Sequence, residues 1–291
     1  MKGIILAGGY GTRLRPITIP TVKQLLPIYD KPLIYYPLSV LMMAGVKDIL
    51  IISTPRDLPR FIELFGNGAD LGLSFSYAIQ DKPRGLPDAF VVGERFIDNE
   101  PVWLILGDNL FFGDKLESTL EDISRKTTGA AVFAYKVKNP ELYGVVEFSD
   151  GDNKVISLEE KPLEPKSNYA LTGLYFFDGR VSDYAKSLTP SVRGETEITD
   201  LMKKYLENGE LSVERLGSGF AWLDTGSCDS MYDASTFVKV MQTRQGVLIS
   251  SPEEIAYRKG FIDKYQFARL AESLSKTDYG QYLLSLVKEG Q

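Results

Sequence analysis

The chain has 291 residues, of which 44% are hydrophobic and 25% charged; this composition is typical of a folded globular protein and excludes a disordered one. Its net charge of −6 argues against nucleic acid or an anionic membrane as a partner, because clustered basic residues bind those surfaces. With one cysteine, Cys228, and no histidine, an intrachain disulfide, a Ser-His-Asp triad and a His-ligated zinc site are excluded. Any metal is therefore expected to be a hard cation such as Mg²⁺.

The first residues, Met-Lys-Gly, lead directly into an apolar run of five residues. That run is too short for a signal peptide, and no cleavage site follows it. The sequence also has no stretch near the roughly 20 apolar residues that a membrane helix needs. We therefore expect a cytoplasmic protein with no membrane segment.

The first half alternates short apolar runs with amphipathic stretches, at residues 3–7, 34–44, 48–52, 59–65, 73–79, 86–96 and 102–106. Runs that are apolar on both faces and separated by helical segments indicate buried parallel strands joined by crossover helices. The predicted fold is α/β, with a doubly wound, mixed but mostly parallel sheet of Rossmann-like type.

From residue 129 the pattern changes to strands that we expect to be antiparallel or mixed, at 130–135, 144–148, 155–160 and 169–177, with a turn at 149–153. Helices are predicted at 181–188, 198–208 and 230–244, and a strand pair at 211–215 and 220–223. The tail has helical signals at 253–259, 263–271 and 279–288. We predict one α/β domain over 1–245, with halves 1–128 and 129–245, and a helical cap over 246–291.

A glycine-rich loop follows the first strand, with the sequence Leu-Ala-Gly-Gly-Tyr-Gly-Thr-Arg-Leu-Arg-Pro at residues 6–16. Glycines allow backbone N–H groups to approach phosphate oxygens closely. Leu14 occupies the third glycine position of a dinucleotide fingerprint, and the Gly-Lys-Ser/Thr of a Walker loop is missing. Taken alone, the glycines are equally consistent with a plain tight turn.

Two cations accompany this loop. Arg13 supplies a guanidinium that can bind two phosphate oxygens, and Lys23 supplies a point charge. Prolines 16, 20 and 27 predict an ordered, non-helical segment that holds Lys23 in place. Surface cations without a ligand are the alternative, but this combination and spacing favour a phosphate site.

The spacing resembles the signature of the sugar nucleotidyltransferase family, Gly-x-Gly-Thr-Arg-Leu-x-Pro-x-Thr followed by Lys and Pro. The resemblance extends over essentially the whole chain and includes residues 23–27, 31–32, 51–55, 107–109, 158–162 and 222–226. It is to the short-form members with a helical C-terminal tail.

The resemblance implies transfer of a thymidylyl group from dTTP to α-D-glucose 1-phosphate, giving dTDP-glucose and pyrophosphate. That reaction is the first step of dTDP-deoxysugar biosynthesis of the dTDP-L-rhamnose type. It also implies that the half 1–128 binds nucleotide and the half 129–245 binds sugar. A homotetramer with a second nucleotide site, where an end product inhibits, is a further implication.

The resemblance also assigns roles to residues. Four are implied in catalysis, namely Arg13, Lys23, Asp108 and Asp224, with Mg²⁺ held by Asp108 and Asp224. Those implied in nucleotide binding are Leu6, Ala7, Gly8, Gly9, Gly11, Thr12, Arg13, Gln24, Gln80 and Gly85. Those implied in binding the sugar phosphate are Asn109, Gly144, Glu159, Glu160, Lys161, Leu171, Tyr175 and Arg193.

The residue types alone leave alternatives open at several of these positions. Asp108 and Asp224 follow apolar runs, as ligand-binding residues at strand ends do, but an Asp in such a turn is more often an Asx turn or a helix cap. Gln80 before a turn is more often a surface residue. Glu159 and Glu160 equally suit an exposed strand end.

A sugar 1-phosphate is already an anionic nucleophile, so the reaction needs no histidine base. We expect direct transfer, with cations and loop amides neutralising the phosphates. Cys228, Asp88 and Val22 depart from the family pattern, where His, Gln and Ser are usual, and Asp88 bears on nucleotide preference. A UTP- or CTP-using enzyme of the same fold and a non-catalytic sugar-nucleotide-binding subunit are the alternatives; an NAD-dependent dehydrogenase is disfavoured.

Overall fold

The computed structural model describes residues 1–149 and 154–289; most of the predicted turn at 149–153 lies outside the described residues. Four of the first apolar runs form the parallel part of a nine-stranded sheet, at one end of its main path β10-β9-β11-β6-β1-β4-β5. Its parallel strands are β1 (Lys2–Leu6), β4 (Asp48–Ser53), β5 (Ser74–Ile79) and β6 (Val102–Leu106). In β1, Ile4 and Ile5 lie in different cores on opposite faces, which explains why the run is apolar throughout.

The second half extends this sheet with antiparallel strands. They are β8 (Ala130–Lys136), β9 (Gly144–Phe148), β10 (Val155–Glu160) and β11 (Tyr169–Phe177). β11 runs antiparallel beside β6, with Phe177 opposite Val102, and also pairs with β8 and β9. The predicted mixed, mostly parallel α/β fold is confirmed.

The predicted pairing of 211–215 with 220–223 is wrong. β12 (Leu211–Leu216) runs parallel to β8 in the large sheet, whereas β13 (Phe220–Asp224) pairs with β7 (Asn109–Gly113) in a separate two-stranded sheet. The two segments are close in sequence, but the partner strands β8 and β7 come from elsewhere in the chain. Local alternation identifies a strand without naming its partner. β7 itself was not predicted.

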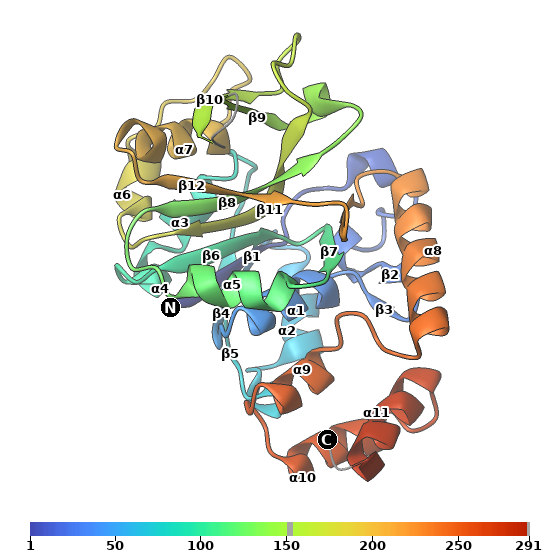
Figure 1. The fold of residues 1–291 in the computed structure, drawn as a ribbon. Helices are drawn as coiled ribbons and strands as arrows, with labels where there is room; N and C mark the ends of the chain where they lie inside the picture. The colour runs from blue at the N-terminus through green and yellow to red at the C-terminus, as the bar shows by residue number, and fades with distance from the viewer. Residues whose placement is uncertain (150–153, 290–291) are drawn as a thin grey trace.

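Helices cover both faces of the large sheet (Figure 1). On one face lie α1 (Tyr35–Met43), α2 (Leu58–Phe65) and α5 (Leu116–Ser124). On the other lie α3 (Asp88–Val92), α4 (Glu94–Ile97), α6 (Val181–Lys186) and α7 (Ile198–Glu207). Residues 86–96 form two helices rather than one stretch, and Gly93, with φ of −86° and ψ of 3°, is the cap between them.

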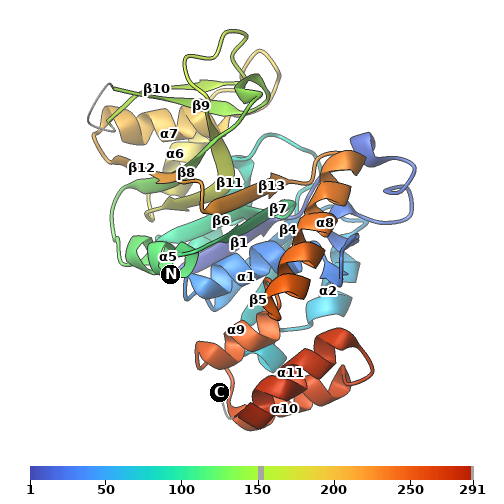
Figure 2. The ribbon, with the colours of Figure 1, turned by 45° about the vertical axis from the view of Figure 1, so that its right-hand side comes forward.

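The C-terminal helices lie at the end of the molecule away from β9 and β10, while α8 (Cys228–Gln245) runs along one side (Figure 2). The tail forms α9 (Pro252–Arg258), α10 (Lys264–Ser273) and α11 (Asp278–Glu289), and α9 packs against α1. The predicted tail helices are thus present, and the domain boundary at residue 245 stays a prediction. In the described part of the chain, no helix has both the length and the apolar character needed to cross a bilayer.

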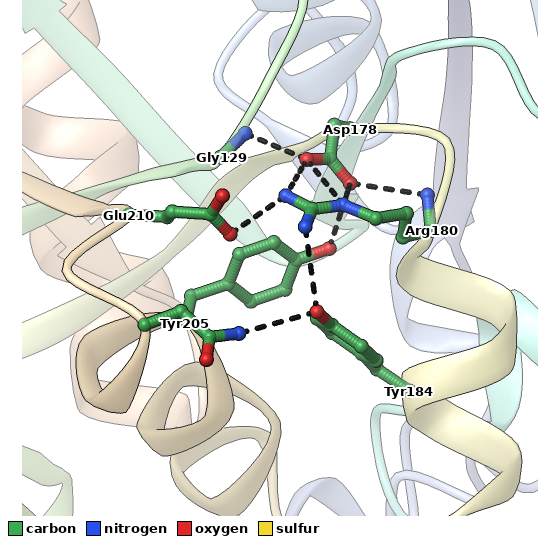
Figure 3. A network of polar contacts seen from close by, with 7 residues as sticks. Gly129, Asp178, Arg180, Tyr184, Tyr205 and Glu210 are labelled. Carbon is green, nitrogen blue, oxygen red and sulfur yellow. Dashed lines mark hydrogen bonds and ion pairs between the residues drawn. The ribbon is translucent and has the colours of Figure 1, made fainter.

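Asp178 follows β11 directly, at the edge of the sheet opposite the glycine loop. There it joins several elements through polar contacts (Figure 3). Its carboxylate accepts hydrogen bonds from the Gly129 N–H at 2.6 Å and the Tyr205 hydroxyl at 3.1 Å, and it pairs with Arg180 at 2.5 Å. Burial alone would raise the pKa of Asp178, but the Arg180 and backbone donors hold it below its ordinary value. Arg180 also pairs with Glu210 at 2.7 Å, so α6, α7 and β12 are tied together.

Candidate active site

The glycine loop leaves β1 at the edge where Asp108 leaves β6. These strands are parallel neighbours with Leu6 opposite Leu106, and the Gly107 N–H donates to the Leu6 carbonyl over 2.9 Å. A Cβ at Gly107 would lie 2.9 Å from Gln24 Cγ and 3.0 Å from the Leu6 carbonyl oxygen. Glycine at this position therefore lets both strand ends and Gln24 approach, and it brings Asp108 beside the loop.

The loop is shaped by its glycines. Gly9 and Gly11 have positive φ values of 100° and 54°, a conformation that favours glycine. The Thr18 hydroxyl donates to the Gly11 carbonyl over 2.7 Å, and a Cβ at Gly11 would lie 2.9 Å from Thr18 Cγ2. This turn borders a cavity of about 210 Å³, which we call the phosphate cavity. It is lined by Gly8, Gly9, Gly11, Thr12, Arg13, Leu14, Lys23, Gln24, Asp108 and Gly226.

Lys23 begins the short 3₁₀ helix η2 (Lys23–Leu25), and its ammonium pairs with the Asp108 carboxylate. The Lys23 side chain is only 11% exposed. The neighbouring Gln24 is buried, and its Oε1 accepts no hydrogen bond from residues 1–149 or 154–289. Because a buried unpaired oxygen is unfavourable, this wall of the phosphate cavity suits a ligand or water that donates a hydrogen bond.

Asp224 reaches the same place from β13. It is the register partner of Asn109 in β7, the Asn109 amide donates to Asp108 Oδ1 over 2.9 Å, and the Thr225 hydroxyl donates to the Asp108 carbonyl over 2.9 Å. Burial raises the pKa of Asp224, and the negative charge of Asp108 raises it further, although Lys23 and Arg13 oppose this. Two carboxylates thus converge where their negative charges repel each other.

This pair fits a divalent cation. Among the described residues, no group of three or more His, Cys, Asp or Glu side chains forms a metal cage. Mg²⁺ does not need one, since it commonly takes one or two carboxylates and completes its shell with substrate phosphates and water. Asp108 and Asp224 beside a phosphate-sized cavity match that donor set, and a cation there would relieve their repulsion.

A second cavity, of about 420 Å³, opens beyond the two aspartates and is called the sugar cavity. Asn109 is fixed in its wall, because its Oδ1 accepts from the Trp222 indole N–H at 2.6 Å and the Gly173 N–H at 3.2 Å. The lining residues are Arg13, Leu86, Leu106, Asp108, Asn109, Glu141, Leu142, Tyr143, Gly144, Glu160, Lys161, Leu171, Gly173, Tyr175, Ile198, Trp222 and Asp224.

Glu160 is one of the acidic residues that line the sugar cavity. It lies opposite Gly144, where a Cβ would be 3.3 Å from Glu160 Oε2, so glycine leaves the carboxylate room. Burial and the charge of Glu197 raise the pKa of Glu160, while Lys161 and Arg193 oppose the shift. This carboxylate therefore has cations nearby and is suited to accept hydrogen bonds.

Glu159 faces the other way. Successive side chains of a strand point to opposite faces, and the Glu159 carboxylate pairs with Lys166 at 2.7 Å. It lines an outer hollow, together with Glu160 and Arg193, and does not line the sugar cavity. Arg193, another predicted sugar-phosphate residue, is likewise absent from the lining of the sugar cavity, whereas Glu160 borders both.

A third cavity, of about 280 Å³, lies beside the glycine loop and is called the base cavity. Gly85 forms part of it with φ of 107°, and a Cβ there would lie 1.9 Å from the Thr196 carbonyl oxygen. The chain at Gly85 is thus held against residues before α7. The lining residues are Leu6, Gly8, Gly9, Gln80, Pro83, Gly85, Leu86, Glu160, Lys161, Arg193, Glu195, Glu197 and Ile198.

The three cavities share walls. The phosphate and base cavities both include Gly8 and Gly9, whereas Arg13 and Asp108 border both the phosphate and sugar cavities. Lys161 borders the base and sugar cavities. The result is one branched cleft with the aspartates and Lys161 near its junction.

Nearly all predicted site residues line this cleft. Besides Glu159, the exception is Ala7, which is fully buried and whose carbonyl accepts from the Ser53 hydroxyl at 2.9 Å. The sequence prediction missed the lining residues Leu86, Tyr143, Glu197, Ile198 and Trp222. Tyr143 and Trp222 adjoin motif residues and could have been found on that ground, whereas Glu197 carries no local signal.

The chain is similar to known enzymes over nearly its full length. Residues 2–240 match the nucleotidyl transferase family model. The glucose-1-phosphate thymidylyltransferase of Neisseria meningitidis serogroup A is 55% identical over 289 residues, covering 99% of this chain and 100% of that protein. The enzyme of the same name from Mycolicibacterium smegmatis is 56% identical over 287 residues and covers 99% of each chain.

Solved structures give the same result. A Bacillus anthracis structure described as a candidate glucose-1-phosphate thymidylyltransferase, in complex with sucrose, is 40% identical with a TM-score of 0.75, over 81% of this chain and 94% of that one. A UDP-glucose pyrophosphorylase complexed with UDP-glucose is 27% identical with a TM-score of 0.72, over 82% and 98%. The chain therefore belongs to the glucose-1-phosphate thymidylyltransferases of the nucleotidyl transferase family.

Proposed function

We propose that this chain transfers the thymidylyl group of dTTP to α-D-glucose 1-phosphate, releasing pyrophosphate and giving dTDP-glucose. The observation that carries the proposal is the branched cleft, in which base, phosphate and sugar cavities meet beside Lys23, Arg13, Asp108 and Asp224. The name shared by the relatives at about 55% identity supports the choice of substrates.

In this proposal the chain acts mainly by charge and position. The sugar phosphate oxygen is the nucleophile, and the negative charges of the two substrates are the barrier to their approach. Arg13, Lys23 and the amides of Gly8 and Gly11 bind the triphosphate, while Lys161 at the cleft junction binds the sugar phosphate. This holds the reacting groups in line without a covalent enzyme intermediate.

Asp108 and Asp224 would hold Mg²⁺ in the proposed enzyme. When bound there, the ion would neutralise negative charge on the α-phosphate and the departing pyrophosphate. Lys23, which pairs with Asp108, would then be available to a phosphate oxygen. Removing divalent ions with EDTA should abolish turnover, and adding Mg²⁺ should restore it.

The sugar would bind among Glu160, Asn109, Gly144, Leu171 and Tyr175. Glu160 accepts hydrogen bonds from sugar hydroxyls, and the fixed Asn109 offers a further polar contact. We extend the proposal to the division into a nucleotide half (1–128), a sugar half (129–245) and a helical cap (246–291). A cytoplasmic homotetramer at the start of a dTDP-deoxysugar pathway is part of the same proposal.

The test is to measure pyrophosphate release with glucose 1-phosphate and either dTTP, UTP or CTP, in the presence of Mg²⁺. We expect the highest kcat/KM with dTTP. A clear preference for CTP would contradict the base assignment, and no turnover with any of the three would favour a non-catalytic sugar-nucleotide-binding subunit. That alternative is disfavoured because Arg13, Lys23 and both aspartates are present and border one cleft.

A second test addresses the phosphate cavity directly. Replacing Lys23 by alanine removes a cation from its wall, and we expect kcat to fall by about 10²–10³-fold. Lys126, which donates to Ser212 in β12, is a control outside the cleft, and its alanine variant should keep wild-type turnover. Near-normal turnover by the Lys23 variant would show that the proposed phosphate contacts are wrong.

A further inference from the structure

The Gln80 side chain lies between two hollows. Gln80 lines the base cavity, whereas Asp88, the first residue of α3, lines a separate hollow on its outer side. Gln80 Nε2 donates a hydrogen bond to Asp88 Oδ2 over 2.8 Å. Asp88 is 9% exposed, so this contact is largely shielded from water. Asp88 thus supports Gln80 from the outer side of the base cavity.

The chemistry of the pair fixes the orientation of the amide. An ionised carboxylate only accepts hydrogen bonds, so the group of Gln80 that faces Asp88 is its NH₂. Because the amide is planar, Oε1 is then turned toward the other side. A Cβ at Gly8 would lie 3.4 Å from Gln80 Oε1, which puts this oxygen at the wall of the base cavity. Gln80 Oε1 therefore offers a hydrogen-bond acceptor to a ligand in the base cavity.

Arg84 completes the surroundings of Asp88. Its Nη1 lies 3.9 Å from Asp88 Oδ1, the oxygen that Gln80 does not use. The carboxylate thus has a cation on one side and an amide donor on the other. Both contacts bring donors to the carboxylate, so an acceptor such as the Gln80 carbonyl would have no partner there.

We propose that Asp88 is a positioning residue that selects the base: it holds Gln80 with its oxygen toward the nucleotide, so the site takes bases with an N–H at N3. Thymine and uracil have that donor, and cytosine has an acceptor there. The inference rests on the proposed function, in which Gln80 faces the base.

Rejection of cytosine follows from the same geometry. For cytosine to bind, the Gln80 amide would have to turn over and offer its NH₂ to N3. Its oxygen would then face the Asp88 carboxylate, and two acceptors would be left against each other in a shielded site. Leaving polar groups unpaired in this way is what makes hydrogen-bonding sites discriminate strongly.

Asp88→Asn tests this directly, because asparagine has nearly the same shape and can offer either its oxygen or its NH₂. Gln80 is then free to turn. The measurement is kcat/KM for dTTP, UTP and CTP at fixed glucose 1-phosphate. We expect the dTTP:CTP ratio to fall about tenfold, as the loss of one hydrogen bond to a charged group would give. The dTTP:UTP ratio should change less than twofold, since both bases carry the N3 donor.

Glu94→Gln is the matched control, since it also removes one acidic charge near α3 but pairs with Lys186 instead of Gln80. It should leave both ratios unchanged. An equal loss for all three nucleotides in Asp88→Asn would indicate a merely structural role and overturn the inference. Wild-type preference for CTP would overturn the proposed function, whereas wild-type preference for dTTP with an unchanged ratio in Asp88→Asn would overturn only the role of Asp88.

A wild-type measurement keeps the inference testable if Asp88→Asn does not fold. dTTP methylated at N3 has no N–H for Gln80 Oε1 to accept. We expect its kcat/KM to be at least tenfold lower than that of dTTP. Equal kcat/KM for the two nucleotides would show that no acceptor is presented to N3 and would overturn the inference.

Discussion

Asp178 follows β11 at the edge of the large sheet opposite the glycine loop, whereas Asp224 ends β13 beside Asp108, and the two side chains have opposite surroundings. Asp178 follows β11 and is held by Arg180, Tyr205 and a backbone N–H, so its pKa is lowered although burial opposes this. Asp224 ends β13 and faces Asp108, so burial and that neighbour raise its pKa. The same side chain is stabilised as an anion at one of these positions and disfavoured as an anion at the other.

The difference fits a structural role for Asp178 and the ligand-binding role that we propose for Asp224. The Gly129 N–H, the Tyr205 hydroxyl and the Arg180 guanidinium all bind the Asp178 carboxylate, so its ionised form stabilises the folded state. The charge of Asp224 is only partly balanced by Lys23 and Arg13. A repulsive pair of this kind costs stability and is expected at a functional site, where a cation and substrate complete it.

The largest effect should come from Asp224→Asn. Removing a proposed Mg²⁺ ligand should lower kcat by about 10³-fold, because transition-state charge is no longer neutralised. The melting temperature should stay the same or rise, since the repulsion with Asp108 is gone. Pyrophosphate release and thermal unfolding measure the two effects. Asp229→Asn, an exposed acid of α8, is the control, and a loss below tenfold in Asp224→Asn would contradict the metal site.

Asp178→Asn should show the opposite pattern, with lower stability and unchanged turnover. The neutral side chain loses charge-assisted hydrogen bonds to Arg180 and Tyr205, and we expect the free energy of unfolding to fall by about 2 kcal/mol. kcat at 25 °C should be unchanged, because Asp178 lies away from the cleft. Denaturant unfolding measures the loss, and Asp183→Asn, an exposed acid whose carboxylate lies 3.9 Å from the Lys186 ammonium, is the matched control. A drop in kcat without a drop in stability would contradict the structural role assigned to Asp178.

Much of the candidate site could be predicted from the sequence because its signals are local. The spacing of Arg13 and Lys23 after the glycines and the strand-end positions of Asp108 and Asp224 can be identified without a structure. The apolar run of β1 likewise predicts a strand buried on both faces, as Ile4 and Ile5 show. These features depend on short segments, and short segments are what a single sequence describes.

What the sequence did not predict depends on distant partners. β12 and β13 were identified as strands, but their partners β8 and β7 are set by the tertiary fold. Likewise, one of two adjacent glutamates must face the cleft, yet which of them does so depends on how β10 pairs with β9. The contact from Gln80 to Asp88 joins a strand end to a helix start and is visible only in three dimensions.

That choice between adjacent glutamates gives the next prediction. Glu160→Gln removes an acceptor from the sugar cavity, so we expect KM for glucose 1-phosphate to rise about tenfold, with a smaller change in KM for dTTP. Glu159→Gln removes only the outer pair with Lys166, and its KM values should stay within twofold of wild type. Steady-state kinetics with each substrate varied gives the answer. A larger effect from Glu159→Gln would reverse the assigned faces of β10.

The smallest effect is in the pH dependence of stability, where the two aspartates should act in opposite directions. Both start from an ordinary pKa of 3.8. Asp178 has a lowered pKa in the folded state, so its stabilisation is present above 3.8 and is lost as the pH falls through the lower, folded value. Asp224 has a raised folded pKa, so it destabilises at neutral pH, and this cost disappears as the pH falls through the raised value toward 3.8.

Comparing each Asn variant with wild type between pH 7 and pH 3 isolates these contributions. The advantage of wild type over Asp178→Asn should persist down to about pH 4 and shrink only below it, because the folded carboxylate keeps its charge until then. As the pH falls, the stability advantage of Asp224→Asn over wild type should begin to shrink earlier than this. The raised pKa of Asp224 means that the folded wild type binds a proton there before it does at Asp178. If the Asp224→Asn advantage grew on acidification, then the carboxylates of Asp108 and Asp224 would not repel each other in the folded protein, and the contrast between Asp178 and Asp224 would lose its basis.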